Sequence, residues 1–146
     1  MATILRMTQL DLNDVYNIEK NAHITPWSKK IIHDCIAVNY GCYVLVQDNA
    51  IYGFMIFRVV SEECHLLNLC VAPKFQGQGV GKSLLVFLLD LVRPHCKSVL
   101  LEVRPSNKVA LKLYETHNFT QTGIKKDYYT DNGNSHEDAI VLELFF

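Results

Sequence analysis

Residues 76–83 read QGQGVGKS and place three glycines at alternate positions before a lysine and a serine. The β-rich run CHLLNLCV at 64–71 precedes this segment, and the apolar run KSLLVFLLDLV at 82–92 follows it. A glycine loop between a strand and a helix leaves backbone N–H groups and the positive end of the helix dipole facing outward. This order limits the chain to folds of mixed α and β structure. It predicts a site for an anionic group such as a pyrophosphate, with a ligand-free turn as the alternative.

Two common nucleotide-binding motifs do not fit this loop. A P-loop has a glycine, four intervening residues and then Gly-Lys-Ser or Gly-Lys-Thr, but the first of these positions is Gln76. A dinucleotide-binding G-x-G-x-x-G begun at Gly77 or Gly79 requires its third glycine at Lys82 or Leu84. The phosphate is therefore expected to belong to another class of ligand.

Length and composition predict one domain spanning residues 1–146, with 49% hydrophobic residues to fill its core. The net charge of -1, without blocks of like charge, argues against nonspecific nucleic-acid binding. We expect no signal peptide and no membrane span, because no apolar run is long enough for either. The odd number of cysteines and the lack of C-x-x-C favour buried, reduced thiols in a cytoplasmic protein. They are Cys35, Cys42, Cys64, Cys70 and Cys96.

Apolar periodicity, turn residues and helix caps predict an alternation of strands and helices. Thr8 with Asp11 resembles a capping box. Ser28 and Ser106 are candidate caps of later helices, and Asp48–Asn49 is a candidate hairpin turn. The middle of the order predicts a right-handed crossover unit in a mostly antiparallel sheet. The expected strands are 3–6, 42–48, 51–60, 64–71, 98–104, 120–129 and 138–146, the last two around a turn at 130–134, and the expected helices are about 8–22, 28–38, 82–92 and 105–119.

Glu102 is a candidate catalytic carboxylate. The strand period of SVLLEVR at 98–104 places it on one face with Leu100 and Arg104, opposite an apolar face. A carboxylate in such surroundings is costly to bury unless it is paired or functional. From spacing alone, Glu102 is either the partner of a lysine or arginine in an ion pair or a general base.

The loop and its flanks resemble the GNAT N-acetyltransferase superfamily. Its signature Q/R-x-x-G-x-G/A, after the fourth strand, is matched by Gln76, Gly79 and Gly81. Similarity to the RimI-type ribosomal-protein alanine N-acetyltransferases covers IEKNAHITPWS, LNLCVAPKFQGQGVGKSLL, LEVRPSNKVALKLYETHNF and YYTDNGNSHEDAIVLEL. The resemblance implies an α+β, three-layer GNAT fold. Its central mixed, mostly antiparallel sheet would have six to seven strands and about four flanking helices.

The same resemblance implies an activity. Such an enzyme transfers the acetyl group of acetyl-CoA directly, in a ternary complex, to the N-terminal alanine amine of the eighteenth small-subunit ribosomal protein. The implied partner is the N-terminal peptide of that protein, with no direct contact to nucleic acid or membrane. Acetyl-CoA is the cosubstrate and no metal is expected.

The residues that bind acetyl-CoA are also implied by the resemblance. Backbone groups of Leu69, Cys70 and Val71 would bind the acetyl carbonyl and the pantetheine arm. Asn107 would bind the cosubstrate from the start of a helix. The pyrophosphate would lie on Gln76, Gly77, Gln78, Gly79, Val80, Gly81 and Lys82.

Two residues carry the catalytic roles in this family. Glu102 matches the proton acceptor, acting directly or through a water, and a slightly raised pKa would suit an α-amine. Tyr114 matches the proton donor to the departing thiolate. Asn107, Leu111 and Tyr114 share one helix face, with Tyr114 roughly 10 Å beyond Asn107.

Trp27, Tyr128 and Tyr129 are expected to line the peptide groove, with plain core or rim aromatics as the alternative. The chain departs from the family at Gly77, where a larger residue is common. Lys125–Asp127 stand where two arginines and an asparagine are expected. These departures concern peptide recognition.

The sequence is also compatible with other acceptors and with a function without catalysis. The acceptor could be a polyamine, an antibiotic amine or a lysine side chain, and a non-catalytic nucleotide-binding module is a further alternative. A nucleophilic role for Cys70 is rejected, because no histidine is placed by sequence to activate it. The six histidines show no metal-ligand spacing, and no role is assigned to them.

Overall fold

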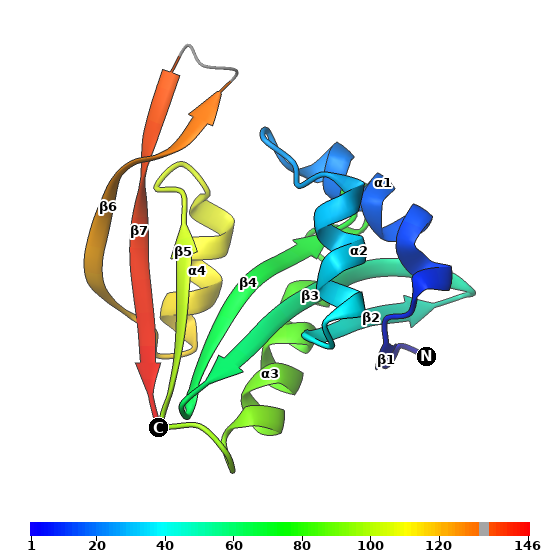
Figure 1. Ribbon diagram of the computed structural model, residues 1–146, viewed down its shortest axis with the longest axis horizontal. Coiled ribbons are helices and arrows are strands. Elements are labelled where there is room, and N and C mark those ends of the chain that lie inside the picture. Colours follow the sequence, from blue (N-terminus) through cyan, green and yellow to red (C-terminus); the bar gives the residue numbers. More distant parts are fainter. Residues whose placement is uncertain (132–134) are drawn as a thin grey trace. The chain divides into compact units, whose positions relative to one another are not determined.

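The computed structural model describes residues 1–131 and 135–146, so most of the turn predicted at 130–134 lies outside the described residues. The described chain forms seven β-strands, four α-helices and two 3-10 helices (Figure 1). In chain order they are β1 (Thr3–Arg6), η1 (Gln9–Asp11), α1 (Leu12–Ala22), α2 (Lys29–Ala37), β2 (Gly41–Gln47), β3 (Ala50–Val60), β4 (Glu63–Val71), η2 (Pro73–Phe75), α3 (Val80–Val92), β5 (Ser98–Val103), α4 (Lys108–Thr116), β6 (Thr120–Asp131) and β7 (Ser135–Phe145).

The strands hydrogen-bond in the order β1-β2-β3-β4-β5-β7-β6. β4 and β5 are parallel, and α3 provides the crossover that a parallel pair requires. The pairs β1–β2, β2–β3, β5–β7 and β6–β7 are antiparallel. The predicted mixed, mostly antiparallel sheet with about four helices is therefore confirmed.

The described residues form two compact units. The first comprises residues 1–58 and 66–91, and the second comprises 59–65 and 92–146. α1, α2 and α3 belong to the first unit, and β5, α4, β6 and β7 to the second. β3 and β4 contribute residues to both.

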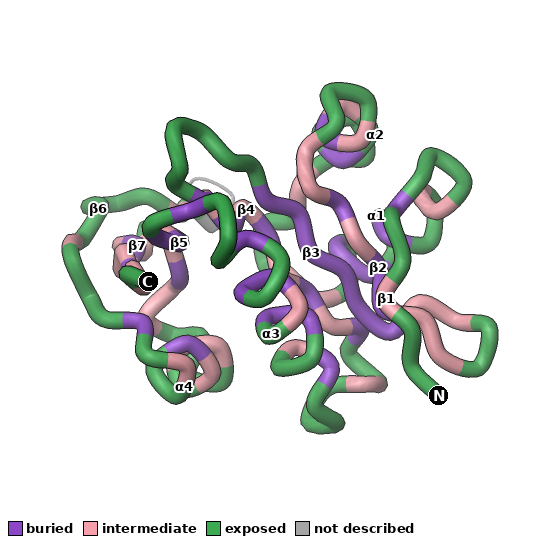
Figure 2. The backbone as a smooth tube through the Cα atoms, turned by 90° about the horizontal axis from the view of Figure 1, so that it is seen from below, coloured by how far each residue is buried: buried purple, intermediate pink, exposed green. Residues whose placement is uncertain are grey.

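In the first unit, β3 is buried on both faces. Figure 2 shows its buried backbone with α1 and α2 on one side and α3 on the other. Phe54 packs into a cluster with Val15 of α1 and Ile32 of α2. Gly53 faces the opposite way, where an added Cβ would lie 2.9 Å from Val80 of α3. Residues of alternating direction on one strand thus hold helices against both faces.

In the second unit, β5 has the two faces predicted from its period. Val99 and Leu101 are buried. The Glu102 side chain, on the other face, is 9% exposed, and Glu102 pairs in register with Val141 of β7. β6 departs from regular pairing between Lys125 and Tyr129. This register shift lies in the stretch of β6 that carries Lys125, Tyr128 and Tyr129.

Two of the predicted helix caps are confirmed. Thr8 and Asp11 form the capping box, in which the Thr8 N–H donates to Asp11 Oδ2 at 2.8 Å. The box opens the short 3-10 helix η1, which leads into α1. The Ser28 hydroxyl accepts from the Ile31 N–H at 3.2 Å and caps α2.

The predicted Ser106 cap is wrong. Asn107 is the N-cap of α4, because its Oδ1 accepts from the Ala110 N–H at 3.2 Å. Ser106 instead donates its hydroxyl to Glu137 of β7 at 2.9 Å, and its backbone N–H donates to the same carboxylate at 2.8 Å. Ser106, which the local pattern predicted as the helix cap, therefore hydrogen-bonds to Glu137, 31 positions away in the chain.

Two expectations from composition can be compared with these elements. All five cysteines are buried free thiols, as predicted. Among the described helices, none has the length and apolar character needed to cross a membrane.

Candidate active site

The glycine loop follows β4 and η2 in the first unit. Gly77 and Gly79 have φ values of 78° and 82°, a conformation that non-glycine residues rarely adopt. A Cβ built on either glycine meets no atom within 4 Å. The loop therefore needs glycine for its backbone conformation, and open space lies beside it. This combination fits a loop that receives an anionic group on its backbone.

The start of α3 continues this surface. The Ser83 N–H donates to the Gly79 carbonyl at 3.0 Å, which begins the helix ladder after the loop. The first N–H groups of a helix have no partner within the helix and lie at the positive end of its dipole. The exposed Lys82 adds a full positive charge in this first turn. Backbone and side chain together favour a phosphate.

The side chain of Gln76 joins the loop to the end of β4. Its Nε2 donates to the Val71 carbonyl at 3.3 Å, so the first residue of the signature closes the segment between them. Cys70 is buried, and Leu69 and Val71 are partly exposed on the same strand. The predicted pantetheine residues and the predicted phosphate loop are thus continuous within the first unit.

Glu102 lies in the second unit, where its carboxylate contacts the side chains of His65 and Lys125. His65 Nε2 lies 2.8 Å from Glu102 Oε1, and Lys125 Nζ lies 3.2 Å from Glu102 Oε2. Burial would raise the pKa of this carboxyl, but the hydrogen bonds and charges of His65 and Lys125 outweigh it and lower the pKa below its ordinary value. The slightly raised pKa that would suit an α-amine is therefore not found at Glu102. Both the base and the ion-pair interpretations fit an ionised Glu102.

His65 is a site residue that the sequence did not reveal. Its partner is 37 positions away and belongs to another strand. The parallel register of β4 and β5 sets His65 beside Leu100, which is on the same face as Glu102. The available signal was the alternation in CHLLNLCV, where His65 stands between two buried apolar residues and therefore points to the opposite face.

Tyr114 is almost fully buried on α4. Its ring packs edge-on against Phe119 at a centroid distance of 5.6 Å. Burial and, to a lesser extent, the neighbouring Tyr129 raise the pKa of the Tyr114 hydroxyl well above its ordinary value. The hydroxyl therefore remains protonated and is able to donate to an anion.

Tyr128 and Tyr129 form a perpendicular pair on β6 with ring centroids 4.9 Å apart. The Arg104 guanidinium lies over the Tyr129 ring at 4.3 Å, and the Lys125 ammonium lies 5.2 Å from the Tyr128 centroid. Arg104 also donates to Glu137 at 3.0 Å. The structure thus gathers these tyrosines and Glu102 in one unit, whereas Trp27 belongs to the first unit with the glycine loop.

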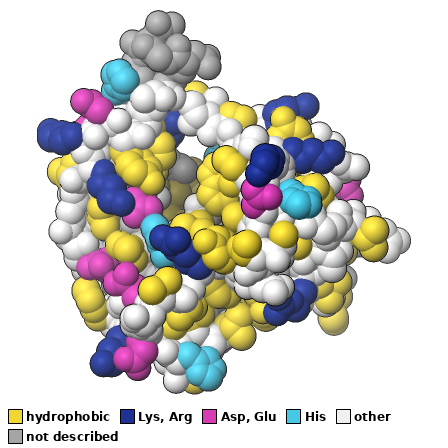
Figure 3. All heavy atoms as spheres, viewed as in Figure 1, with side chains coloured by type: hydrophobic (Ala, Val, Ile, Leu, Met, Phe, Trp, Pro, Cys, Tyr) yellow, Lys and Arg dark blue, Asp and Glu magenta, His cyan; other side chains and the backbone are white. Residues whose placement is uncertain are grey.

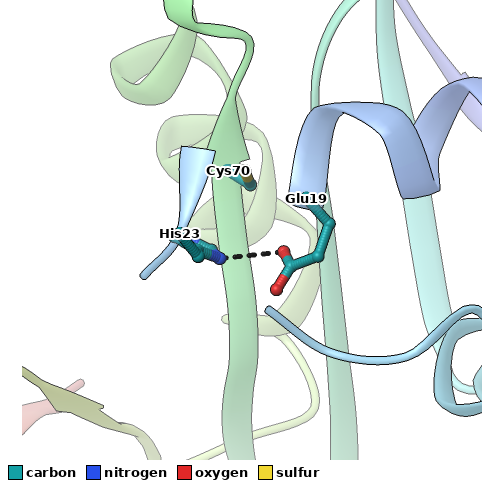
Figure 4. Close-up of side chains that lie close together, drawn as sticks. All are labelled: Glu19, His23 and Cys70. Atoms are coloured by element: carbon teal, nitrogen blue, oxygen red, sulfur yellow. Dashed lines mark ion pairs between the residues drawn. The ribbon is translucent and has the colours of Figure 1, made fainter. Parts of the chain in front are cut away.

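Trp27 is held by a buried carboxylate. Figure 4 shows Glu19 of α1, exposed by only 1%, with His23 and Cys70 beside it. The Trp27 N–H donates to Glu19 Oε2 at 2.9 Å, and Asn68 and His23 each approach Oε1 to 2.9 Å. Burial opposes ionisation, but these partners lower the pKa of Glu19 below its ordinary value. The carboxylate thereby fixes the segment between α1 and α2 to β4.

Glu19, His23 and Cys70 also have the donor types of a metal site, with ligand atoms within 4.8 Å of one another. A metal ion there would have to replace the hydrogen bonds that Glu19 already accepts. Burial, and then the charge of Glu19, raise the pKa of the Cys70 thiol well above its ordinary value. A neutral thiol is a poor metal ligand and a poor nucleophile. His23 is thus near Cys70, which the sequence did not predict, yet the thiol stays unreactive.

Lys and Arg side chains are interspersed with Asp and Glu side chains on the face drawn in Figure 3. This agrees with the net charge of -1 and with a site that depends on individual charges rather than on a broad field.

A mixed sheet with a glycine loop after β4, and a carboxylate on the parallel strand β5, defines the acetyltransferase architecture. The Acetyltransferase (GNAT) family model matches residues 6–119, and the chain belongs to this family. It is 37% identical over 99% of its length to the [Ribosomal protein bS18]-alanine N-acetyltransferase of Escherichia coli K12, covering 97% of that protein. The corresponding protein of Haemophilus influenzae is 34% identical, with 99% of each chain covered.

Solved structures give the same result. The crystal structure of the Escherichia coli ribosomal-protein-S18-alanine N-acetyltransferase superposes with a TM-score of 0.91 at 37% identity, over 99% of this chain and 94% of that one. Ard1 from Thermoplasma volcanium superposes with a TM-score of 0.90 at 26% identity, over 99% and 97%. The predicted fold and family are therefore confirmed.

Proposed function

We propose that this chain transfers the acetyl group of acetyl-CoA to the N-terminal alanine amine of bacterial small-subunit ribosomal protein 18. The observation that carries the proposal is the 37% identity, over 99% of the chain, to an Escherichia coli protein whose name states this activity. The match includes both halves of the chain, and so includes the predicted cosubstrate loop and the predicted base.

We assign acetyl-CoA binding to the glycine loop, to the end of β4 and to Asn107. In this assignment, Gln76–Lys82 bind the pyrophosphate through backbone N–H groups and the Lys82 charge. Backbone groups of Leu69–Val71 bind the acetyl carbonyl and pantetheine arm. Asn107 adds a side-chain contact, since its amide N–H₂ group is not needed for the cap that its Oδ1 makes. The open space beside Gly77 and Gly79 supports this assignment.

The acceptor enters as an ammonium and must lose a proton before it can attack. Glu102, held ionised by His65 and Lys125, accepts that proton directly or through one water. The neutral amine attacks the thioester carbon, a C–N bond forms, and the tetrahedral centre collapses with loss of the C–S bond. On forming the amide, the nitrogen loses a second proton. This loss matches the proton that the departing thiolate gains.

Tyr114 supplies the proton to the departing thiolate in this scheme. Its raised pKa keeps the hydroxyl protonated until a strong base forms beside it. Burial also keeps water from competing for the hydrogen bond. Tyr114 is restored by the proton that the amine nitrogen releases. Glu102 then gives the first proton to solvent, and both residues return to their starting protonation states.

A carboxylate of lowered pKa suits an α-amine better than a lysine side chain. The α-ammonium has a pKa near 7.7–8.0 and the lysine ammonium one near 10.4. A difference of about 2.5 units corresponds to roughly 3.4 kcal/mol in favour of the N-terminus before any contact forms. Trp27, Tyr128 and Tyr129 are proposed to surround the first residues of the acceptor.

Peptides that differ only in the acceptor amine test this proposal. We expect mass spectrometry to find rapid acetylation of a peptide with a free N-terminal alanine and much slower acetylation of the same peptide beginning with leucine. A peptide with a blocked N-terminus and an internal lysine should react very little. If the blocked lysine peptide reacts as fast as the alanine peptide, the N-terminal assignment is wrong.

A further inference from the structure

We propose that the Lys125 ammonium occupies the position on Glu102 that the acceptor's α-ammonium takes, so that acceptor binding displaces this side chain. Lys125 is then an internal competitor that sets acceptor affinity. The inference rests on the proposed function, because it assumes that Glu102 receives the acceptor.

Glu102 and Tyr128 are both expected to contact the acceptor, and both interact with the Lys125 ammonium. Lys125 Nζ lies 3.2 Å from Glu102 Oε2 and 5.2 Å from the centroid of the Tyr128 ring. Glu102 was expected as the base and Tyr128 as a groove residue, each without reference to Lys125. A carboxylate oxygen and an aromatic face together form a site for an ammonium ion.

The other oxygen of Glu102 is already engaged. His65 contacts Oε1 at 2.8 Å, and the Glu102 side chain is only 9% exposed. A base must lie within hydrogen-bond reach of the amine, directly or through one water. The acceptor ammonium and the Lys125 ammonium therefore compete for Oε2 of Glu102. Both cannot bind this oxygen favourably at once, because two positive charges so close together repel each other.

Lys125 is able to leave this position. Its side chain is 48% exposed, compared with 20% for His65, and it ends a flexible four-carbon stem. When the Lys125 ammonium moves away from Glu102, it also leaves the Tyr128 ring that it lies over. The Tyr129 face stays covered by Arg104. The geometry thus assigns Tyr128, rather than Tyr129, to the acceptor ammonium.

Lys126 provides a matched control on the adjacent position. It lies mostly exposed and pairs with Asp138 at 3.6 Å. Lys125→Met and Lys126→Met remove the same charge from the same strand, but only the first removes a cation from Glu102. A general effect of net charge would act equally in both variants.

Steady-state kinetics with a free-alanine peptide measure the effect. For Lys125→Met we expect the acceptor KM to fall about two- to fivefold, the range of an exposed ion pair. The acidic limb of kcat/KM should move to higher pH, because Lys125 lowers the pKa of Glu102. Of the groups that face Glu102, His65 and Tyr129 remain in this variant. Lys126→Met should keep the pH profile of the wild-type protein, because its ammonium pairs with Asp138 and not with Glu102.

Calorimetry of the same peptide, with coenzyme A present, separates this inference from the proposed function. Tighter peptide binding by Lys125→Met than by the wild-type protein and Lys126→Met supports the inference even if no acetylation occurs, and that outcome rejects only the proposed function. An active wild-type enzyme whose two variants have equal KM values and equal peptide affinities overturns the inference. A rise of KM in Lys125→Met alone also overturns it.

Discussion

At the scale of single residues, Glu102 combines low exposure with a charge that persists. His65 and Lys125 hold its pKa below the ordinary value, so the carboxylate form is present above that range and is lost only as the pH falls through the lowered pKa. At pH values between the lowered pKa of Glu102 and the pKa of an α-ammonium, near 7.7–8.0, Glu102 is ionised and most of the acceptor is protonated. The small fraction of neutral acceptor amine then limits the rate. Activity should therefore rise with pH towards the pKa of the acceptor.

Glu102→Gln tests the role of this carboxylate. The amide keeps the size of the side chain but cannot accept a proton, so we expect turnover at neutral pH to fall by about 10²- to 10⁴-fold. The residual rate should increase with pH as the neutral amine fraction grows. Acetyl-CoA affinity, measured by calorimetry, should change little. Wild-type turnover in this variant would leave Glu102 as a structural ion-pair residue.

The contacts of Glu19 lead to a prediction about the free energy of unfolding. Glu19→Ala leaves the Trp27 N–H and the side chains of Asn68 and His23 without their acceptor, and should cost about 3–5 kcal/mol of unfolding free energy in urea. Because the pKa of Glu19 is lowered, its contribution is complete above the ordinary value of 4.5 and is lost as the pH falls through the lowered pKa. The gap between variant and wild type should shrink in acid. The exposed Glu115→Ala serves as control, and equal effects would refute the anchoring role.

Residue-level prediction from sequence succeeded where the neighbours were local. The face of Glu102 followed from the strand period, and the burial of the cysteines followed from their chemistry. His65 and the Ser106–Glu137 contact could not be predicted, because their partners lie 37 and 31 positions away in the chain. Strand register decides such contacts, and a single strand does not reveal its register.

At the scale of elements, the glycine loop joins β4 to α3 with two residues of positive φ. Gly79→Ala forces a side chain into that conformation, at a cost of about 1–2 kcal/mol, and adds a methyl group to the proposed phosphate surface. We expect a folded protein with clearly weaker acetyl-CoA binding by calorimetry. Gly123→Ala is the control, because its added Cβ meets Val141 at an ordinary 3.8 Å. Unchanged affinity in Gly79→Ala would remove the loop from the site.

At Asn107, the N-cap of α4, the capping role and the proposed contact with acetyl-CoA can be tested separately. Aspartate also caps helices, so Asn107→Asp should retain stability within a few tenths of a kcal/mol. It removes the amide donors and adds a negative charge, so acetyl-CoA affinity should fall. Asn107→Ala should lose about 1 kcal/mol of stability as well. If Asn107→Asp binds acetyl-CoA like the wild-type protein, Asn107 is a cap only.

Elements were predicted well because apolar periodicity and turns are local signals. The Asp48–Asn49 turn, for example, has positive φ at both residues, as a two-residue hairpin requires. β6 continues to Asp131, beyond its predicted end at 129, and β7 begins at Ser135, before its predicted start at 138. The cap of α4 shifted by one residue because Ser106 and Asn107 both favour that position and a tertiary contact took Ser106.

At the scale of the whole molecule, the mixed sheet and the family followed from the glycine loop and its flanks, whereas the strand order came only from the structure. The signature residues Gln76, Gly79 and Gly81 led to the family that the comparisons establish. The single domain over 1–146 and the cytoplasmic location stay predictions. The pairing of Glu102 with His65 and Lys125 is the part of the site that only the folded chain supplies.

The acceptor is the central claim, and tandem mass spectrometry of the ribosomal protein itself tests it most directly. Purified, unacetylated small-subunit ribosomal protein 18 with an N-terminal alanine is incubated with acetyl-CoA and the enzyme, or with Glu102→Gln. We predict that the wild-type enzyme adds one acetyl group, on the α-amine of alanine, and that the variant adds it far more slowly. Acetyl groups on lysine side chains instead of the N-terminus, or none at all, would contradict the account.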